Sequence, residues 1–183
     1  MDRRRALSLT ASLLGTAVIG SEFFLAGCTN HTDGGMVLSG NEILFLDEIG
    51  ETILPESEQS PGAKAARIGE FMWTMVNDCY SPEESETFLA GIKNIQDASV
   101  EKFNNGFLDI SAGERNELLS EIDIEARNEI RNGKNHFFAM MKQLTIWGYF
   151  SSEIGSTKAL RFNPVPGRYE GCVPYNKGEK AWA

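Results

Sequence analysis

Residues 136–150 read HFFAMMKQLTIWGYF and are apolar on nearly every side of a helix. A helix at the surface of a globular protein carries a polar face, whereas a helix that is apolar all round is expected in the interior. We therefore expect residues 136–150 to form the buried central helix of the fold.

Four segments before this stretch have the spacing of amphipathic helices, with apolar residues repeating every three and four positions. Ser39 and Ser111 are each followed three residues later by a glutamate, a pattern that caps the first turn of a helix. Ser81 is followed by a proline and two glutamates, which also favours a helix start. The predicted helices cover about residues 39–54, 65–79, 82–104 and 111–132. With the central helix they predict an all-α fold, a compact bundle of about five helices.

The chain changes character from Gly155 onward, where prolines, glycines and aromatic residues follow one another without helical periodicity. Disordered tails are poor in aromatic residues. We therefore expect the irregular tail, residues 155–183, to dock on its own domain or, as we favour, on a partner protein. The residues that we assign to a partner interface are Trp147, Tyr149, Phe162, Pro164, Pro166, Tyr169, Tyr175 and Trp182.

The N-terminal region resembles a bacterial export signal. Three arginines at positions 3–5 precede an apolar run over about residues 11–25, which small and hydroxyl residues and Glu22 interrupt. The run is too short and too interrupted for a membrane span. Consecutive arginines before an apolar pair are typical of the twin-arginine route, which carries folded cargo. We expect residues 1–27 to be a twin-arginine signal peptide.

Cys28 follows this region directly. The residues Leu25-Ala26-Gly27-Cys28 look like a lipobox, in which the cysteine thiol receives a diacylglycerol. Residues 28–38 are short and polar and contain glycine, which predicts a flexible lipidated tether. The remaining residues, 39–183, are enough for one helical domain with a hydrophobic core. We expect a lipid-anchored protein on the periplasmic side of a bacterial membrane.

The charge of the chain restricts its partners. Its formal net charge is −9, and residues 1–27 hold three arginines against Asp2 and Glu22, so the remainder carries −10. A body this acidic is repelled by phosphate backbones and by anionic lipid head groups. The composition therefore argues against nucleic acid as a partner and leaves the lipid on Cys28 as the membrane anchor.

Two cysteines remain, Cys79 and Cys172. An oxidising periplasm permits a disulfide between them. Two separate buried thiols explain them equally well, and the sequence leaves both interpretations open.

No pattern in the sequence is typical of a catalytic or cofactor site. The two histidines, His31 and His136, are far apart in the chain, and a lone histidine at the start of an apolar helix is usually a core or rim residue. Motifs for covalent haem, iron–sulfur clusters, catalytic zinc and dinucleotides do not occur. We expect this chain to hold no catalytic residue, no metal and no cofactor.

Three parts of the sequence carry a family resemblance. They are Ile53-Leu54-Pro55 with Pro61-Gly62-Ala63, the block IWGYFSSEIGSTKALRFNPVPG at residues 146–167, and the ending Gly171-Cys172-Val173-Pro174-Tyr175. With them, the region from about Leu44 to the C-terminus resembles the gluconate 2-dehydrogenase subunit 3 family. The block at residues 146–167 is the most specific part.

The resemblance implies a small subunit that pairs with a larger FAD-dependent flavoprotein of the glucose-methanol-choline type, often with a cytochrome c subunit as electron acceptor. The flavin and substrate sites would then belong to the large subunit. In such complexes the small subunit typically carries the twin-arginine signal for both. We therefore expect a non-catalytic subunit of a sugar or polyol dehydrogenase that acts as export escort, maturation factor and membrane anchor.

The alternative function is a stand-alone sugar-binding lipoprotein. In that case Trp73, Trp147 and Tyr149 would line a cleft, because aromatic faces stack on sugars.

Overall fold

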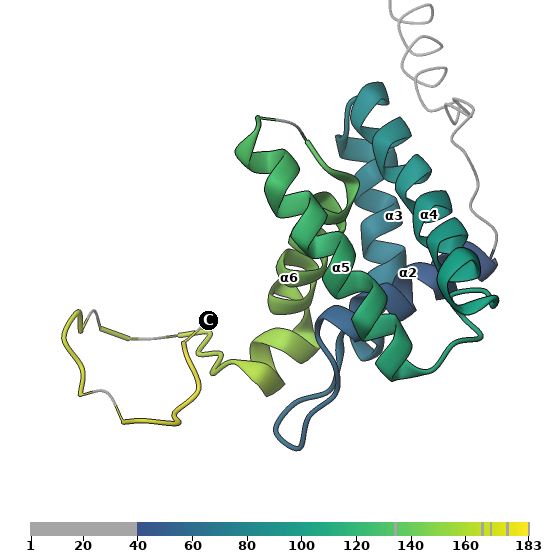
Figure 1. Ribbon diagram of the computed structural model, residues 1–183. Coiled ribbons are helices and arrows are strands. Elements are labelled where there is room, and N and C mark those ends of the chain that lie inside the picture. Colours follow the sequence, from purple (N-terminus) through teal and green to yellow (C-terminus); the bar gives the residue numbers. More distant parts are fainter. Residues whose placement is uncertain (1–39, 134, 166, 169, 175, 183) are drawn as a thin grey trace, which may run out of the picture. The chain divides into compact units, whose positions relative to one another are not determined.

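The computed structural model describes residues 40–133, 135–165, 167–168, 170–174 and 176–182. All of them belong to one unit of the chain, residues 36–183. The described part contains the α-helices α2 (Gly40–Ile53), α3 (Ile68–Cys79), α4 (Pro82–Phe103), α5 (Ala112–Arg131) and α6 (Phe137–Ser151) (Figure 1). A 3-10 turn, η1 (Ala63–Ala66), precedes α3, and a π-helical turn, η2 (Gly155–Ala159), follows α6. The predicted all-α fold is confirmed.

Two helices begin at the serines that the sequence had indicated, and each start is a capping box. At α4 the Ser81 hydroxyl accepts from the Glu84 amide, and the Glu84 carboxylate accepts from the Ser81 amide. Ser111 and Glu114 form the same pair at α5. Each box satisfies amides that have no partner inside the helix, so the two boundaries follow from local sequence. The third expected cap, Ser39, lies outside the described residues.

The second predicted helix begins later than expected. The backbone at Arg67 is left-handed, with φ 54°, and separates η1 from α3. The carboxylate of Asp47, on α2, accepts a hydrogen bond of 2.7 Å from the Gly69 amide in the first turn of α3. The start of α3 is therefore fixed by a residue far away in the sequence. The spacing of apolar residues within 65–79 could not indicate such a contact.

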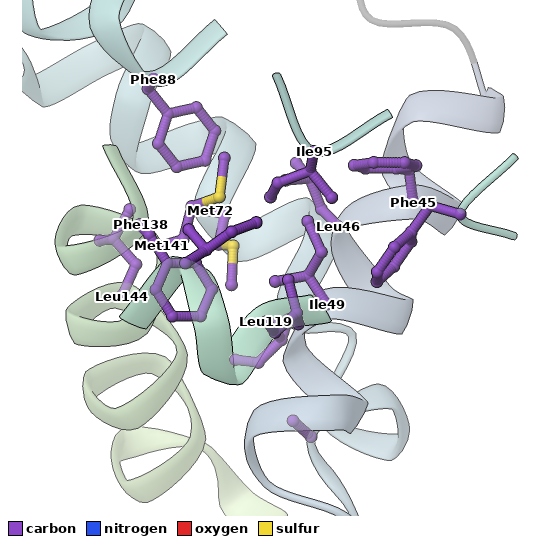
Figure 2. Close-up of a cluster of buried hydrophobic side chains, with 14 of the residues drawn as sticks. Phe45, Leu46, Ile49, Met72, Phe88, Ile95, Leu119, Phe138, Met141 and Leu144 are labelled. Atoms are coloured by element: carbon purple, nitrogen blue, oxygen red, sulfur yellow. The ribbon is translucent and has the colours of Figure 1, made fainter. Parts of the chain in front are cut away.

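The core forms around α6, which contacts all four other α-helices. Phe138, Met141 and Leu144 of α6 are buried. Figure 2 shows them beside apolar side chains of the other helices, namely Leu46, Ile49, Met72, Phe88, Ile95 and Leu119. The central position predicted for residues 136–150 is therefore correct for this face of the helix.

The expectation that α6 is buried all round is wrong for its opposite face. The exposed fractions of Ile146, Trp147 and Phe150 are 43%, 54% and 37%. The other four α-helices therefore leave this face partly uncovered. The helix α6 has the sequence of a buried helix, yet it carries an apolar strip at the surface of this chain.

None of the helices in the described residues is both long and apolar enough to span a membrane.

Glycines let the helices approach closely where α6 meets its neighbours. A Cβ atom built on Gly91 of α4 would lie 2.3 Å from the Phe137 ring, and one on Gly148 would lie 2.4 Å from the Phe71 ring. Neither distance is compatible with a side chain. The packing of α4 and α3 on α6 therefore depends on hydrogen atoms at these two positions.

The first prediction concerns this close packing. Gly91→Ala should lower the free energy of unfolding by about 1–3 kcal/mol, because the added methyl group overpacks the contact with Phe137. Gly113→Ala is the matched control: its Cβ would have the Ser111 hydroxyl as nearest neighbour at 4.0 Å, and alanine favours helix by up to about 1 kcal/mol. Urea unfolding followed by circular dichroism measures both. Equal stability of the two variants would contradict the packing described here.

Candidate functional site

The uncovered face of α6 forms one wall of a groove, and α5 forms the other. The groove has a volume of about 760 Å³. We call it the α5/α6 groove; its apolar residues are Ala126, Ile130, Ala139, Ile146, Trp147 and Phe150, and its polar residues are Asp123, Arg127, Lys142, Gln143 and Ser151. A mostly apolar groove of this size is the kind of surface that a protein partner or a ligand covers.

Trp147 is the largest side chain in the groove, and it is held in place from behind. Its indole packs edge-on against the Phe71 ring, with 5.8 Å between the ring centroids and an interplanar angle of 86°. Phe71 in turn lies against Gly148. Trp147 is therefore half exposed yet supported by α3, which is typical of an aromatic residue that anchors an interface.

Charged side chains join α5 and α6 at the edge of the groove. Asp123 accepts a hydrogen bond of 2.7 Å from Lys142 on α6 and pairs with Arg127 one turn further along α5. Burial alone would raise the pKa of the Asp123 carboxyl, but the hydrogen bonds from Lys142 and Arg127 outweigh burial and hold this pKa below its ordinary value. The charged side chains at this edge, Asp123, Arg127 and Lys142, are therefore paired with one another. The apolar residues of the groove are then the feature that a partner would contact.

The tail that follows α6 closes on itself. We call residues 161–182 the C-terminal loop. The Arg161 amide donates to the Ala181 carbonyl at 2.8 Å, and the Arg161 guanidinium lies 3.8 Å from the centroid of the Trp182 ring. The described residues between these ends are exposed and extend away from the helices (Figure 1). The two ends of the loop are therefore joined to each other, and the described residues between them are exposed to solvent.

The predicted interface residues fall into four groups. Trp147 lines the α5/α6 groove, while Phe162, Pro164 and Trp182 lie exposed in the C-terminal loop. Tyr149 is a correction: it is buried, and its hydroxyl donates to the Pro61 carbonyl, so it is a core residue that a partner cannot reach. Three predicted interface residues, Pro166, Tyr169 and Tyr175, lie outside the described residues.

The lipidation site and the N-terminal segments also lie outside the described residues. This applies to Cys28, to the signal peptide at residues 1–27 and to the tether at residues 28–38.

The two cysteines of the described part are both free and both exposed. The interpretation of Cys79 and Cys172 as buried thiols is therefore wrong. The disulfide between them is not formed in this structure and stays a prediction for the oxidised protein.

The three aromatic residues proposed for a sugar cleft do not line a common cavity. Tyr149 is buried, and Trp73 packs against the core from α3. Only Trp147 lines the α5/α6 groove. The geometry therefore does not support the sugar-binding alternative.

A second groove, of about 710 Å³, lies between α4 and α5 and is acidic. Its carboxylates are Glu83, Glu86, Asp97, Glu101, Glu125 and Glu129. His136 lies beside it as the N-cap of α6, with Nδ1 accepting from the Phe138 amide at 3.2 Å. This is the rim position expected for that histidine. Among the described residues no three histidine, cysteine or carboxylate side chains are grouped as a metal site.

Sequence reasoning missed the residues that depend on tertiary contacts. The four-residue spacing of Asp123 and Arg127 was visible as a helical ion pair, but Lys142 joins it from another helix. The role of Arg161 could not be predicted either, because no sequence pattern indicates that it contacts Trp182.

The family model described as gluconate 2-dehydrogenase subunit 3 matches residues 41–167, which run from the start of α2 into the C-terminal loop. No curated protein and no solved structure matches the chain.

The second prediction concerns the tie between α5 and α6. Asp123→Asn should lower the free energy of unfolding by about 1 kcal/mol at pH 7, because the two ion pairs are lost. The pKa of Asp123 is lowered in the folded state, so its stabilising contribution is present above its ordinary pKa of 3.8 and is lost as the pH falls through the folded value. Between pH 7 and a pH well below 3.8 the difference from wild type should therefore shrink.

Urea unfolding at both pH values measures this difference. Glu125→Gln is the control, since Glu125 is an exposed neighbour on α5 for which the described residues show no ion pair. If both variants lost the same stability at pH 7, the tie would have no specific role.

Proposed function

The chain belongs to the gluconate 2-dehydrogenase subunit 3 family, and from this membership we propose that it is the non-catalytic small subunit of a periplasmic FAD-dependent sugar or polyol dehydrogenase complex. The family description makes the chain a subunit of a gluconate dehydrogenase complex. The roles that we propose within that complex are export escort, maturation factor and membrane anchor. FAD and the substrate site belong to the large subunit in this proposal.

One observation carries the proposal most directly: the apolar face of α6 is uncovered. Helices that are apolar all round are interior helices, and the exposed strip of Ile146, Trp147 and Phe150 lines a groove of about 760 Å³. Large apolar grooves on single chains usually mark contact surfaces. In a subunit of a complex, the natural cover for this groove is another subunit.

The N-terminal sequence supports the escort and anchor roles. The twin-arginine route exports folded proteins, so one signal on the small subunit can carry a folded flavoprotein attached to it. The cysteine at the end of the lipobox, Cys28, would then hold the complex at the membrane. A single anchor on the small subunit removes the need for a membrane segment in the large one.

The third prediction tests the subunit role. A tagged full-length chain purified from native membranes should bring down a flavoprotein, seen as flavin absorbance in the eluate. Trp147→Ala should weaken this association about 30-fold, because a supported aromatic anchor contributes about 2 kcal/mol or more to binding. Flavin recovered per tagged chain, over a series of detergent washes, measures the effect.

Ile124→Ala is the matched control. Ile124 is also exposed, to 61%, and lies on α5, but it does not line the α5/α6 groove. It should leave flavin recovery unchanged, and circular dichroism should show both variants folded. The proposal fails if the wild-type chain brings down no flavoprotein. The assignment of the groove fails if both variants recover flavin equally.

A further inference from the structure

Charge is divided unevenly between the helical body and the C-terminal loop. Residues 40–160 contain 10 basic and 21 acidic side chains, a net charge of −11. Residues 161–182 contain four basic side chains, Arg161, Arg168, Lys177 and Lys180, against two acidic ones, a net charge of +2. A basic loop thus extends from a strongly acidic body.

The ends of the loop are joined by interactions that we call the clasp. It consists of the hydrogen bond from the Arg161 amide to the Ala181 carbonyl, the stacking of the Arg161 guanidinium on Trp182, and an ion pair of 3.6 Å between Arg161 and Glu179. Arg161 therefore binds the returning end of the loop in three ways: through its backbone amide, through the face of its guanidinium and through its charge. An arginine combines these contacts better than a lysine, since only its guanidinium stacks flat on a ring.

Lys180 attaches the returning end of the loop to the helical body. Its ammonium donates to the Lys158 carbonyl in η2 and, at 3.4 Å, to the Gln59 carbonyl in the turn between α2 and η1. Two of the four basic side chains of the loop, Arg161 and Lys180, are thus engaged in holding its ends. The apolar side chains of its middle, Phe162, Val165 and Val173, remain exposed.

We propose that the clasp holds the C-terminal loop in a form ready to bind, and that the loop fits an acidic surface with apolar pockets on the flavoprotein subunit. This inference rests on the proposed function. It also reassigns Trp182: with one face of its ring covered by Arg161, it is a positioning residue of the loop and not the anchor that the sequence suggested. Phe162, Val165 and Val173 take the role of anchors.

The physical reasons are entropy and charge. Joining the ends of a long loop before binding removes ordering entropy that association would otherwise have to overcome. The opposite signs of loop and body orient the chain on a partner that is acidic under the loop and basic under the body. A second copy of this chain offers an acidic body to the loop as well, through a head-to-tail contact that would build a ring or an open chain of copies. The membership in a family of dehydrogenase subunits favours a different subunit as the partner.

The experiment compares three variants of the full-length chain. Arg161→Ala removes the stacking, the ion pair with Glu179 and one charge, and leaves only the backbone hydrogen bond of the clasp. Trp182→Ala removes the stacking without changing charge. Arg168→Ala removes the same charge from the loop but leaves the clasp intact. Arg168 is a suitable control because its ion pair among the described residues is with Glu170, within the loop. Arg161→Lys adds a conservative variant that keeps the charge.

Two readouts are expected to separate the clasp from simple charge. In the purified chain, hydrogen exchange of the backbone amide at position 161 should become about tenfold faster in Arg161→Ala and Trp182→Ala and stay unchanged in Arg168→Ala. Binding of the co-purifying flavoprotein should weaken about tenfold in the first two variants, and this loss should persist in high salt, where differences of charge are screened. Arg168→Ala should weaken it about threefold in low salt only, since salt screens steering charges. Arg161→Lys should restore part of the affinity.

Several results would overturn the proposal. If Trp182→Ala kept full affinity, or if Arg168→Ala weakened binding as much as Arg161→Ala in high salt, the clasp would not prepare the loop. Rapid exchange of the Arg161 amide in the wild-type chain would mean that the clasp does not form, even if the flavoprotein binds. A protected amide in a chain that binds no flavoprotein would instead refute the proposed function. Concentration-dependent self-association in sedimentation would refute the choice of partner.

Discussion

The position of α6 is the constraint on which the rest of the structure depends. Its sequence has no polar face, so α2, α3, α4 and α5 must all pack around it. Such crowding is allowed only because Gly91 and Gly148 let the Phe137 and Phe71 rings approach the helix backbones. Four neighbours still leave part of α6 exposed. The α5/α6 groove is therefore a direct consequence of building an interior helix into a chain with too few helices to surround it.

The end of α6 connects this constraint to the C-terminal loop. A Cβ atom on Gly155 would lie 1.8 Å from the Tyr149 carbonyl oxygen, so only glycine permits η2 to fold back against the last turn of α6. Tyr149 is itself fixed through its hydroxyl to the Pro61 carbonyl. Residues 146–167, the block that carries the family resemblance, thus contain the exposed strip, this tight turn and the beginning of the loop. The α6 wall of the groove and the beginning of the loop therefore belong to one continuous segment.

Features that depend on neighbouring residues could be predicted from the sequence, and features that depend on distant ones could not. The helix starts at Ser81 and Ser111 followed from local capping. The break at Arg67 did not, because Asp47 of another helix holds the start of α3. Tyr149 was taken for a surface aromatic because helical spacing does not show which face stays uncovered. Arg161 and Trp182 stand 21 positions apart in an irregular segment, so only the folded chain brings them together.

The proposed function requires that this chain takes a folded flavoprotein through the twin-arginine route and holds it at the membrane. The most direct test replaces Arg3, Arg4 and Arg5 with lysine in the small subunit alone and measures flavoprotein in the periplasmic and cytoplasmic fractions. Arg131→Lys serves as the control, because it makes the same exchange at an exposed position on α5 and leaves Arg3, Arg4 and Arg5 intact. The triple variant is expected to retain the flavoprotein in the cytoplasm, while Arg131→Lys exports it normally. Normal export of the flavoprotein beside a retained small subunit would contradict the claim.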